Sequence, residues 1–439
     1  MATTTSTTGG SGYRQVLAVG EFRAVFAAHV VSFSGDVIAQ LALAVLVFER
    51  TGSALGSSLT FALGFVPHAF GGTLLSSVAD RFPVRRTLIC CDLASAGLVA
   101  LMALPGLPIP LLLALLLPLG AIAPVFGGAR AASLPDVLGG EGFVLGRSLL
   151  RMVAQTSQVG GFALGGALLA VLSPRSLLLL DAASFVASAV LLRVGTRERP
   201  PRADLPSAAD AARRSMARDS LAGVRLALGS PRLRPLLLFS WLPPAFTVAP
   251  EALAAPYIAR LGGSPAAVGL LLAAAAAGSV AGMFTAGSWL SPSRRLRFMV
   301  PLATWTFLPL LCFAARPGLV PAMALLALSG LGWAYSIGLD HRLLDATPEH
   351  LRGRTLSLAT SGLMLANGLG FAAAGAAAEL ANPQVVIVAS SLAGLLVVML
   401  LAHPVTASIR QAATHRDHDL RLKAGCGRPI DHLTLRRSS

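Results

Sequence analysis

Long apolar runs alternate with short polar stretches along most of the chain. A helix crosses the hydrocarbon core of a membrane with about 20 residues, so apolar runs of roughly 18 or more residues predict membrane-spanning helices. By this rule the pattern predicts an all-α membrane protein with twelve transmembrane helices. They are expected at Phe22–Phe48, Ala54–Val78, Thr87–Leu104, Leu107–Phe126, Ser148–Leu172, Ser176–Val194, Leu236–Ile258, Ala266–Leu290, Phe298–Ala314, Leu319–Leu339, Thr355–Leu380 and Val385–Ala402.

Arginine gathers in every second connection between these runs. The basic connections, together with the two ends of the chain, hold Arg14, Arg23, Arg81, Arg85, Arg86, Arg130, Arg147, Arg151, the arginines between Arg193 and Arg234, Arg294, Arg295, Arg297, Arg342, Arg352, Arg354 and the basic C-terminal tail. The intervening connections hold one arginine each at most: Arg50, Arg175, Arg260 and Arg316. Because Lys and Arg collect in cytoplasmic loops, this alternation predicts an even number of spans with both termini cytoplasmic. A multi-pass protein of the plasma (inner) membrane is therefore expected.

A Pro- and Arg-rich stretch divides the apolar runs into two sets of six. We predict a cytoplasmic N-terminal segment at 1–21, an N-terminal six-helix bundle at 22–194, and a cytoplasmic linker at 195–235. The middle of the linker has helix-forming composition and several arginines, which predicts an amphipathic helix on the membrane surface. A C-terminal six-helix bundle at 236–402 and a basic cytoplasmic tail at 403–439 complete the chain.

Composition supports a membrane protein and argues against other classes. Mean hydropathy is +0.71, and charged residues make up 13% of the sequence, against about 25% in soluble domains. The formal charge of +15 is spread along one predicted membrane side, so we interpret it as topology and attraction to anionic lipid, with no nucleic-acid partner. The 4 cysteines show neither a disulfide framework nor metal-ligand spacing. No metal, cofactor or catalytic residue is expected, and the chain is not expected to be an enzyme.

Charged side chains fill the short loop between the second and third predicted helices. They are Asp80, Arg81, Arg85 and Arg86. Their spacing resembles the loop between helices 2 and 3 of major facilitator superfamily transporters, written G-x-x-x-D-R-x-G-R-R, with Ser76 and Pro83 in place of its two glycines. The resemblance implies the major facilitator fold and a gating latch between the two halves formed by these four charges. A purely topological role, as positive-inside anchors, is the alternative and is favoured for Arg85 and Arg86.

The segment Ala129–Asp136 narrows the resemblance to one branch of this superfamily. Its sequence, A-R-A-A-S-L-P-D, is similar to the P-A-R-x-A-x-x-P-D loop of the bacterial transmembrane secretion-effector branch, which includes enterobactin and macrolide exporters. The resemblance implies proton-coupled efflux of a small lipophilic molecule, such as a drug, an antibiotic or a siderophore, by alternating access. The expected partners are this substrate, protons and membrane lipid, and the expected state is a monomer. A lipid or lysolipid mover, an uptake symporter of the same fold, and a non-transporting scaffold or receptor remain as alternatives.

The fifth predicted helix keeps part of an exporter signature, G-x-x-x-G-P-x-x-G-G. Gly161, Gly165 and Gly166 would allow close helix packing, but Phe162 replaces the proline. The arginine that such antiporters carry within helix 4 is also missing from the run Leu107–Phe126.

Ionisable groups inside spans are costly and usually functional. Asp36 lies deepest, and Gln40 and His29 share its helix face by their spacing. Glu251 follows Pro250 in the seventh helix, where further prolines predict breaks of the kind that line transport cavities. We predict that these four residues form the proton and substrate cavity. A structural hydrogen-bonding role is the alternative for Asp36, and Asp92, Asp181, Asp340 and Glu379 are expected to be structural.

Overall fold

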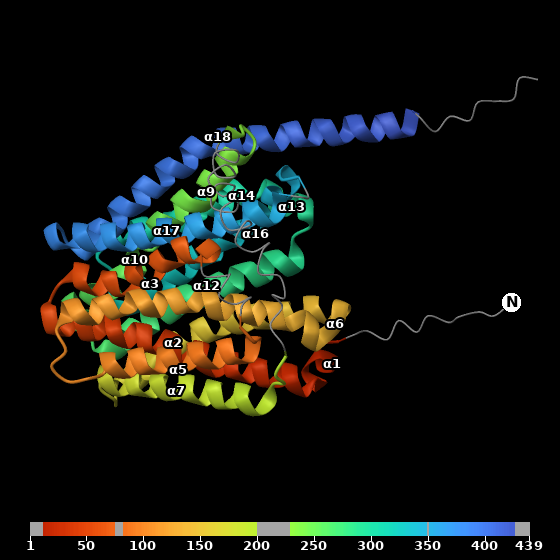
Figure 1. The fold of residues 1–439 in the computed structure, drawn as a ribbon. Helices are drawn as coiled ribbons and strands as arrows, with labels where there is room; N and C mark the ends of the chain where they lie inside the picture. The colour runs from red at the N-terminus through yellow and green to blue at the C-terminus, as the bar shows by residue number, and fades with distance from the viewer. Residues whose placement is uncertain (1–11, 75–81, 200–228, 349–350, 426–439) are drawn as a thin grey trace, which may run out of the picture.

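A computed structural model describes residues 12–74, 82–199, 229–348 and 351–425 of the chain (Figure 1). The described residues form helices joined by short turns, with no strand among them. The N-terminal half contains α1 (Tyr13–Ala18), α2 (Gly20–Thr51), α3 (Ala54–Leu74), α5 (Val84–Met102), α6 (Ile109–Leu169) and α7 (Pro174–Gly195). The C-terminal half contains α9 (Leu233–Thr247), α10 (Ala249–Ala252), α11 (Ala254–Arg260), α12 (Pro265–Trp289), α13 (Pro292–Arg297), α14 (Met299–Leu311), η1 (Cys312–Ala315), α15 (Leu319–Leu331), η2 (Gly332–Ala334), α16 (Tyr335–Ala346), α17 (Arg352–Leu380) and α18 (Pro383–Gly425). The predicted amphipathic helix of the linker lies outside the described residues.

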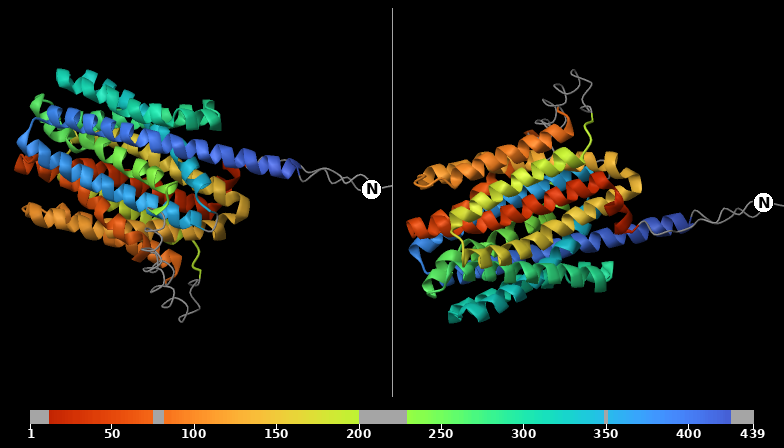
Figure 2. Two further views of the ribbon diagram at one scale, coloured as in Figure 1. Left: turned by 90° about the horizontal axis from the view of Figure 1, so that it is seen from above. Right: turned by 90° about the horizontal axis from the view of Figure 1, so that it is seen from below.

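The helices of both halves run roughly along one common axis (Figure 2). Within the described residues, 8 helical segments are long and apolar enough to cross a membrane. They are Gly20–Thr51, Ile109–Gly139, Pro174–Gly195, Leu233–Arg260, Pro265–Trp289, Leu319–Ala346, Thr355–Leu380 and Pro383–Thr406. The other four predicted runs are also helical, on α3, α5, the second part of α6, and α14 with η1, but they are shorter or less apolar where described. The predicted all-helical, multi-pass character is thereby confirmed for the described residues.

The predicted loop between the fourth and fifth helices is wrong. Helix α6 continues through it from Ile109 to Leu169, and only Gly139 leaves the helical conformation, at φ 68° and ψ −178°. A positive φ suits glycine because it has no Cβ, so this residue marks the junction between two helical limbs. The fourth helix therefore extends to Gly139 and carries Arg130, a residue that the sequence pattern assigned to a loop.

The two main contacts between the halves are made by α3 with α17 and by α6 with α12. Close approach explains the glycines of the second limb of α6. A Cβ on Gly166 would meet the backbone of Gly269 in α12, and one on Gly161 would lie 2.8 Å from Val37 in α2. Helix–helix interfaces in membranes favour such small residues because dispersion forces act only at short range.

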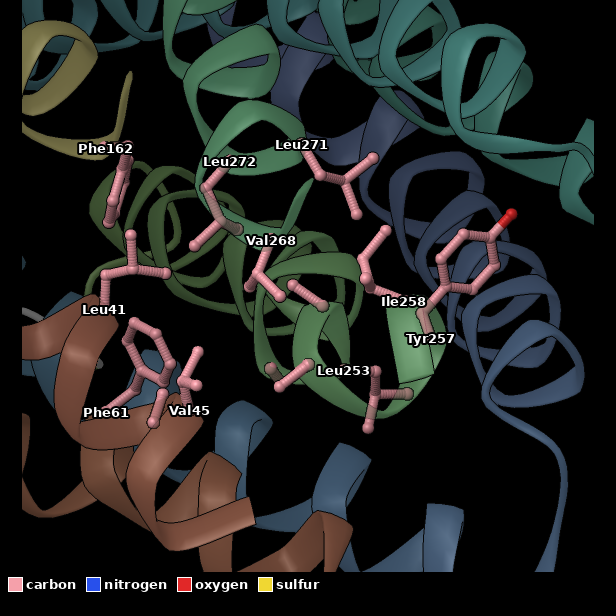
Figure 3. Packing of buried hydrophobic residues seen from close by; sticks show 14 of the residues in the cluster. Leu41, Val45, Phe61, Phe162, Leu253, Tyr257, Ile258, Val268, Leu271 and Leu272 are labelled. Carbon is pink, nitrogen blue, oxygen red and sulfur yellow. The ribbon is translucent and has the colours of Figure 1, made fainter. Parts of the chain in front are cut away.

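One apolar cluster joins the halves at a single end of the bundle. It combines Leu41, Val45, Phe61 and Phe162 of the N-terminal half with Leu253, Tyr257, Ile258, Val268, Leu271 and Leu272 of the C-terminal half (Figure 3). We call this the arginine-poor end, because it holds the turns after α2, α11 and α17. The apolar clusters toward the opposite, arginine-rich end each belong to one half. One cluster lies in the C-terminal half, among residues between Leu233 and Val405, and two lie in the N-terminal half, among residues between Val16 and Leu192.

Candidate functional site

Three acids meet inside the N-terminal half. Asp36, in the middle of α2, is half-buried, and its electrostatic neighbours are Asp181 of α7 and Asp92 of α5. Asp92 and Asp181 are 2% and 1% exposed. Ser188 donates a hydrogen bond to Asp92 at 2.6 Å, and Ser184 donates one to Asp181 at 3.1 Å. Buried charges need partners, and these hydroxyls supply only part of what ionised carboxylates require.

One base lies beside this group of acids. Arg130 is within electrostatic range of Asp92, its guanidinium contacts the Nδ1 atom of His29, and it lies 5.6 Å from the ring centroid of Phe126. The ring of His29 in turn packs edge-on against Phe33. Polar residues thus connect four helices in order: Ser188 of α7, Asp92 of α5, Arg130 of α6 and His29 of α2. Among the three acids, Asp92 is the one with a basic neighbour.

The structure separates residues that the helix spacing placed together. His29 contacts Arg130, whereas Asp36 has Asp181 and Asp92 as its electrostatic neighbours. Gln40 is half-buried and has no hydrogen bond to a described residue. Asp92 and Asp181, which were expected to be structural, are brought close to Asp36 by the packing of α5 and α7 on the rest of the half.

A signal for the acid group was present in the sequence. Asp181, Ser184 and Ser188 follow one another at helical spacing in the sixth predicted run, on α7, which places three polar groups on one side of a helix. The role of Arg130 could not be found in this way, since its helix was expected to end at Phe126.

A cavity of about 340 Å³ opens between α2 and α7 beside the acids. Asp181 and Ser184 line it from α7, and Ser34 and Gly35 line it from α2. Ser34 also donates a hydrogen bond to Ser157 on the second limb of α6, at 3.0 Å. A Cβ on Gly35 would collide with Ser184 and Asp181, so glycine at this position lets α7 carry its polar face against α2.

Glu251 lies in the other half and by itself. It occupies the short helix α10, which Val248 and Leu253 separate from α9 and α11. The seventh predicted helix is thus interrupted, as its prolines predict, although Pro243 and Pro244 themselves lie inside α9 and the interruptions come later. Glu251 is half-buried and has no ion pair or hydrogen bond to a described residue, and α10 packs on α17 and α3 at the contact between the halves.

The predicted latch falls partly outside the described residues, where Asp80 and Arg81 lie. Arg86 forms an ion pair with Glu198 at 2.5 Å, and Arg85 donates a hydrogen bond to the carbonyl of Arg193. Arg85 is thereby bound to the end of α7 and Arg86 to the start of the linker, and neither contact involves the C-terminal half.

The start of the linker is held by a second ion pair at the same end. Arg199 binds both carboxylate oxygens of Glu21, at 2.5 and 2.8 Å, and the backbone N–H of Arg197 donates to the same carboxylate. The hydrogen bond to Glu21 raises the pKa of Arg199. Residues 197–199 are thereby fixed to the beginning of α2.

A polar contact between the halves lies at the arginine-poor end, and sequence reasoning missed it. Glu379 of α17 accepts hydrogen bonds from Ser53 Oγ at 2.7 Å and from the backbone N–H of Leu55 at 2.9 Å, at the start of α3. Deeper along the same contact, Phe371 of α17 stacks on Phe61 of α3, with ring centroids 5.1 Å apart. The halves are thus joined here by an apolar cluster with a carboxylate at its rim.

Comparisons with known proteins give a consistent picture. A family model described as Major Facilitator Superfamily matches residues 25–253. The chain is 26% identical over 378 residues to the multidrug efflux pump Tap of Mycolicibacterium fortuitum, covering 83% of this chain and 90% of that protein. It is 28% identical over 402 residues to the enterobactin exporter EntS of Shigella dysenteriae, covering 89% and 92%.

Solved structures show the same fold. A bacterial homologue of the human lysosomal transporter Spinster, in an inward-facing and occupied conformation, superposes with a TM-score of 0.66 at 16% identity, covering 92% of this chain and 98% of that one. The nucleoside transporter NupG superposes with a TM-score of 0.71 at 14% identity, covering 88% and 99%. At these identities the likeness concerns the fold alone.

Proposed function

The chain belongs to the major facilitator superfamily, and we propose that it exports a small lipophilic molecule by proton-coupled alternating access. The observation that carries the direction of transport is the nearly end-to-end match with two exporters, Tap and EntS. The protein is a non-enzymatic, multi-pass membrane transporter. Its substrate class, its coupling ion and the cytoplasmic position of its termini are parts of the proposal.

The arginine pattern supports the orientation. If the arginine-rich end faces the cytoplasm of a bacterial inner membrane, the apolar cluster of Figure 3 closes the outer side. The described apolar clusters nearer the cytoplasm do not join the halves. This arrangement corresponds to an inward-facing state, in which substrate enters from the cytoplasm or from the membrane, and export requires the outer contacts to break.

The acid group supports proton coupling. The electrostatic neighbours of Asp36 are two further acids, and an ionised carboxylate without a counter-ion is costly in a membrane. Binding of a proton removes that cost, so the group can change charge during a transport cycle. Coupling arises if the two protonation states of Asp36 favour different arrangements of the halves, because a ligand shifts an equilibrium only by its differential affinity. Glu251, at the contact between the halves, is the second candidate for this role.

Flux into sealed vesicles tests the proposal. The purified full-length protein is reconstituted into proteoliposomes, a proton gradient is imposed, and transport of lipophilic drugs and siderophores is measured with and without a protonophore. Gradient-dependent movement opposite to the protons supports the proposal, and movement in the same direction as protons indicates an uptake symporter. Movement of lysolipid alone indicates a lipid mover, and absence of flux from correctly inserted protein indicates a scaffold or receptor.

A further inference from the structure

The cavity between α2 and α7 lies on the outer flank of the N-terminal half. Helix α7 packs mainly on α2 and α5, and Figure 1 shows it at the edge of the molecule away from the C-terminal half. Leu180, Ala183 and Ala187 line the cavity from α7 and are themselves exposed. In a membrane-spanning helix, apolar side chains exposed in this way face lipid. The cavity is therefore reached from the membrane and not from the contact between the halves.

The floor of this cavity is acidic and has no base of its own. Asp181 lines it while only 1% exposed. Ser184, which lines the same cavity, donates a hydrogen bond to Asp181. Asp36 follows the cavity residue Gly35 in the chain; it has no hydrogen bond to a described residue, and its electrostatic neighbours are acids. Arg130 interacts with Asp92 instead, so the charge of the two acids nearest the cavity is left without a fixed cation.

We propose that this groove, between α2 and α7, is an entry site for amphiphilic organic cations that reach the protein from the surrounding membrane. The cationic group lies against Asp181, with Asp36 behind it, and the apolar body lies along Val31 and Ile38 of α2 and the exposed face of α7. The inference rests on the proposed function and names the substrate class and its route.

The size and chemistry of the groove agree with such a ligand. A volume of about 340 Å³ is at the small end of ligand pockets, so it holds a charged group with a short apolar part, and a longer body extends over Leu180 and Ala183. A neutral molecule of the same shape gains the apolar contacts but leaves the acids without a counter-ion. An anion adds repulsion from two carboxylates. The groove therefore selects by charge first and by shape second.

Binding of a permanent cation tests the site without the complication of substrate protonation. The full-length protein in phosphatidylcholine nanodiscs is titrated with radiolabelled tetraphenylphosphonium. Asp181→Asn keeps the size of the side chain and removes its charge, and we expect at least about tenfold weaker binding, as for the loss of one charged contact. Ala183→Trp fills the rim without touching the acids, and it is expected to abolish binding.

Val194→Trp is the matched control. Val194 lies on the same helix as Ala183, is 83% exposed and does not line the groove. Wild-type affinity in this variant, with loss in the other two, supports the site. Wild-type affinity in Asp181→Asn and Ala183→Trp, with each variant monodisperse in size-exclusion chromatography, overturns it. Displacement of the probe by phosphatidylethanolamine in the nanodisc would also contradict the proposal, because the groove would then hold a lipid amine.

Flux separates the failure of the site from the failure of the function. If wild-type protein binds the probe in the expected pattern but transports nothing, the proposed function is wrong and the site stands. If wild-type protein exports tetraphenylphosphonium and both groove variants export it equally well, the function stands and the groove is not the entry site.

Discussion

Removing the carboxylate of Glu379 should loosen the closure at the arginine-poor end. This single side chain accepts two hydrogen bonds from the start of α3, from Ser53 Oγ and from the N–H of Leu55. It thus acts as a helix cap supplied by the other half of the molecule. A helix cap contributes about 0.5–2 kcal/mol, and an anion at an exposed helix N-terminus about 0.3–1 kcal/mol. Because Glu379 is exposed, we take about 1–2 kcal/mol for Glu379→Ala, which changes the ratio of closed to open molecules roughly 5- to 30-fold.

Distances between spin labels measure this shift. Val171, beyond the end of α6, and Ser264, before α12, are exposed residues of opposite halves at this end, and labels there report their separation. A cysteine-free background carrying Val171→Cys and Ser264→Cys should show one dominant short distance. Glu379→Ala should raise the long-distance population by the factor above. Glu49→Ala removes an exposed acid at the same end of α2 and should leave the distribution unchanged. Identical distributions for Glu379→Ala and the parent would refute the reasoning.

Three further predictions concern coupling, stability and topology. Asp36→Asn should abolish gradient-driven efflux and leave substrate exchange measurable, because a permanently neutral group fills the site but cannot change charge; equal loss of both would mean that Asp36 binds substrate or braces α2. Arg130→Met should lower the melting temperature in detergent, because Asp92 loses its basic neighbour, and adding Asp92→Asn should restore part of the loss; no recovery would assign Arg130 to packing alone. With the native cysteines removed, an impermeant thiol reagent on intact cells should label Ser264→Cys and not Ser207→Cys, which lies in the linker outside the described residues; the reverse pattern would invert the topology.

The sequence was informative where the membrane itself imposes the pattern. A spanning helix must be apolar for about 20 residues whatever it packs against. The positions of the spanning helices could therefore be predicted from hydropathy. The glycines of the fifth run could likewise be assigned to packing, because close approach leaves no room for a side chain. In contrast, the length of α6 could not be predicted from hydropathy, because the helix continues beyond the apolar run into the polar segment on both sides of Gly139.

The partners of the ionisable residues could not be read from spacing along one helix. Asp36 and His29 have a spacing that places them on one face of α2, yet each lies near a charged residue of a different helix: Asp36 near Asp181 of α7, and His29 against Arg130 of α6. Glu379 looked like a residue at the end of a span, but it is placed against α3, a helix more than 300 residues away in the chain. Such contacts depend on which helices become neighbours, and hydropathy does not encode that choice.

The most direct test of the account is gradient-driven flux of tetraphenylphosphonium by the full-length wild-type protein in proteoliposomes. With the lumen made acidic, the membrane potential held at zero by equal potassium and valinomycin, and the probe outside, the account predicts accumulation above that of protein-free vesicles in exchange for protons, collapse of this excess by a protonophore, and no excess with Asp36→Asn. Absence of accumulation in wild-type vesicles of verified insertion, or accumulation that the protonophore leaves unchanged, would contradict it.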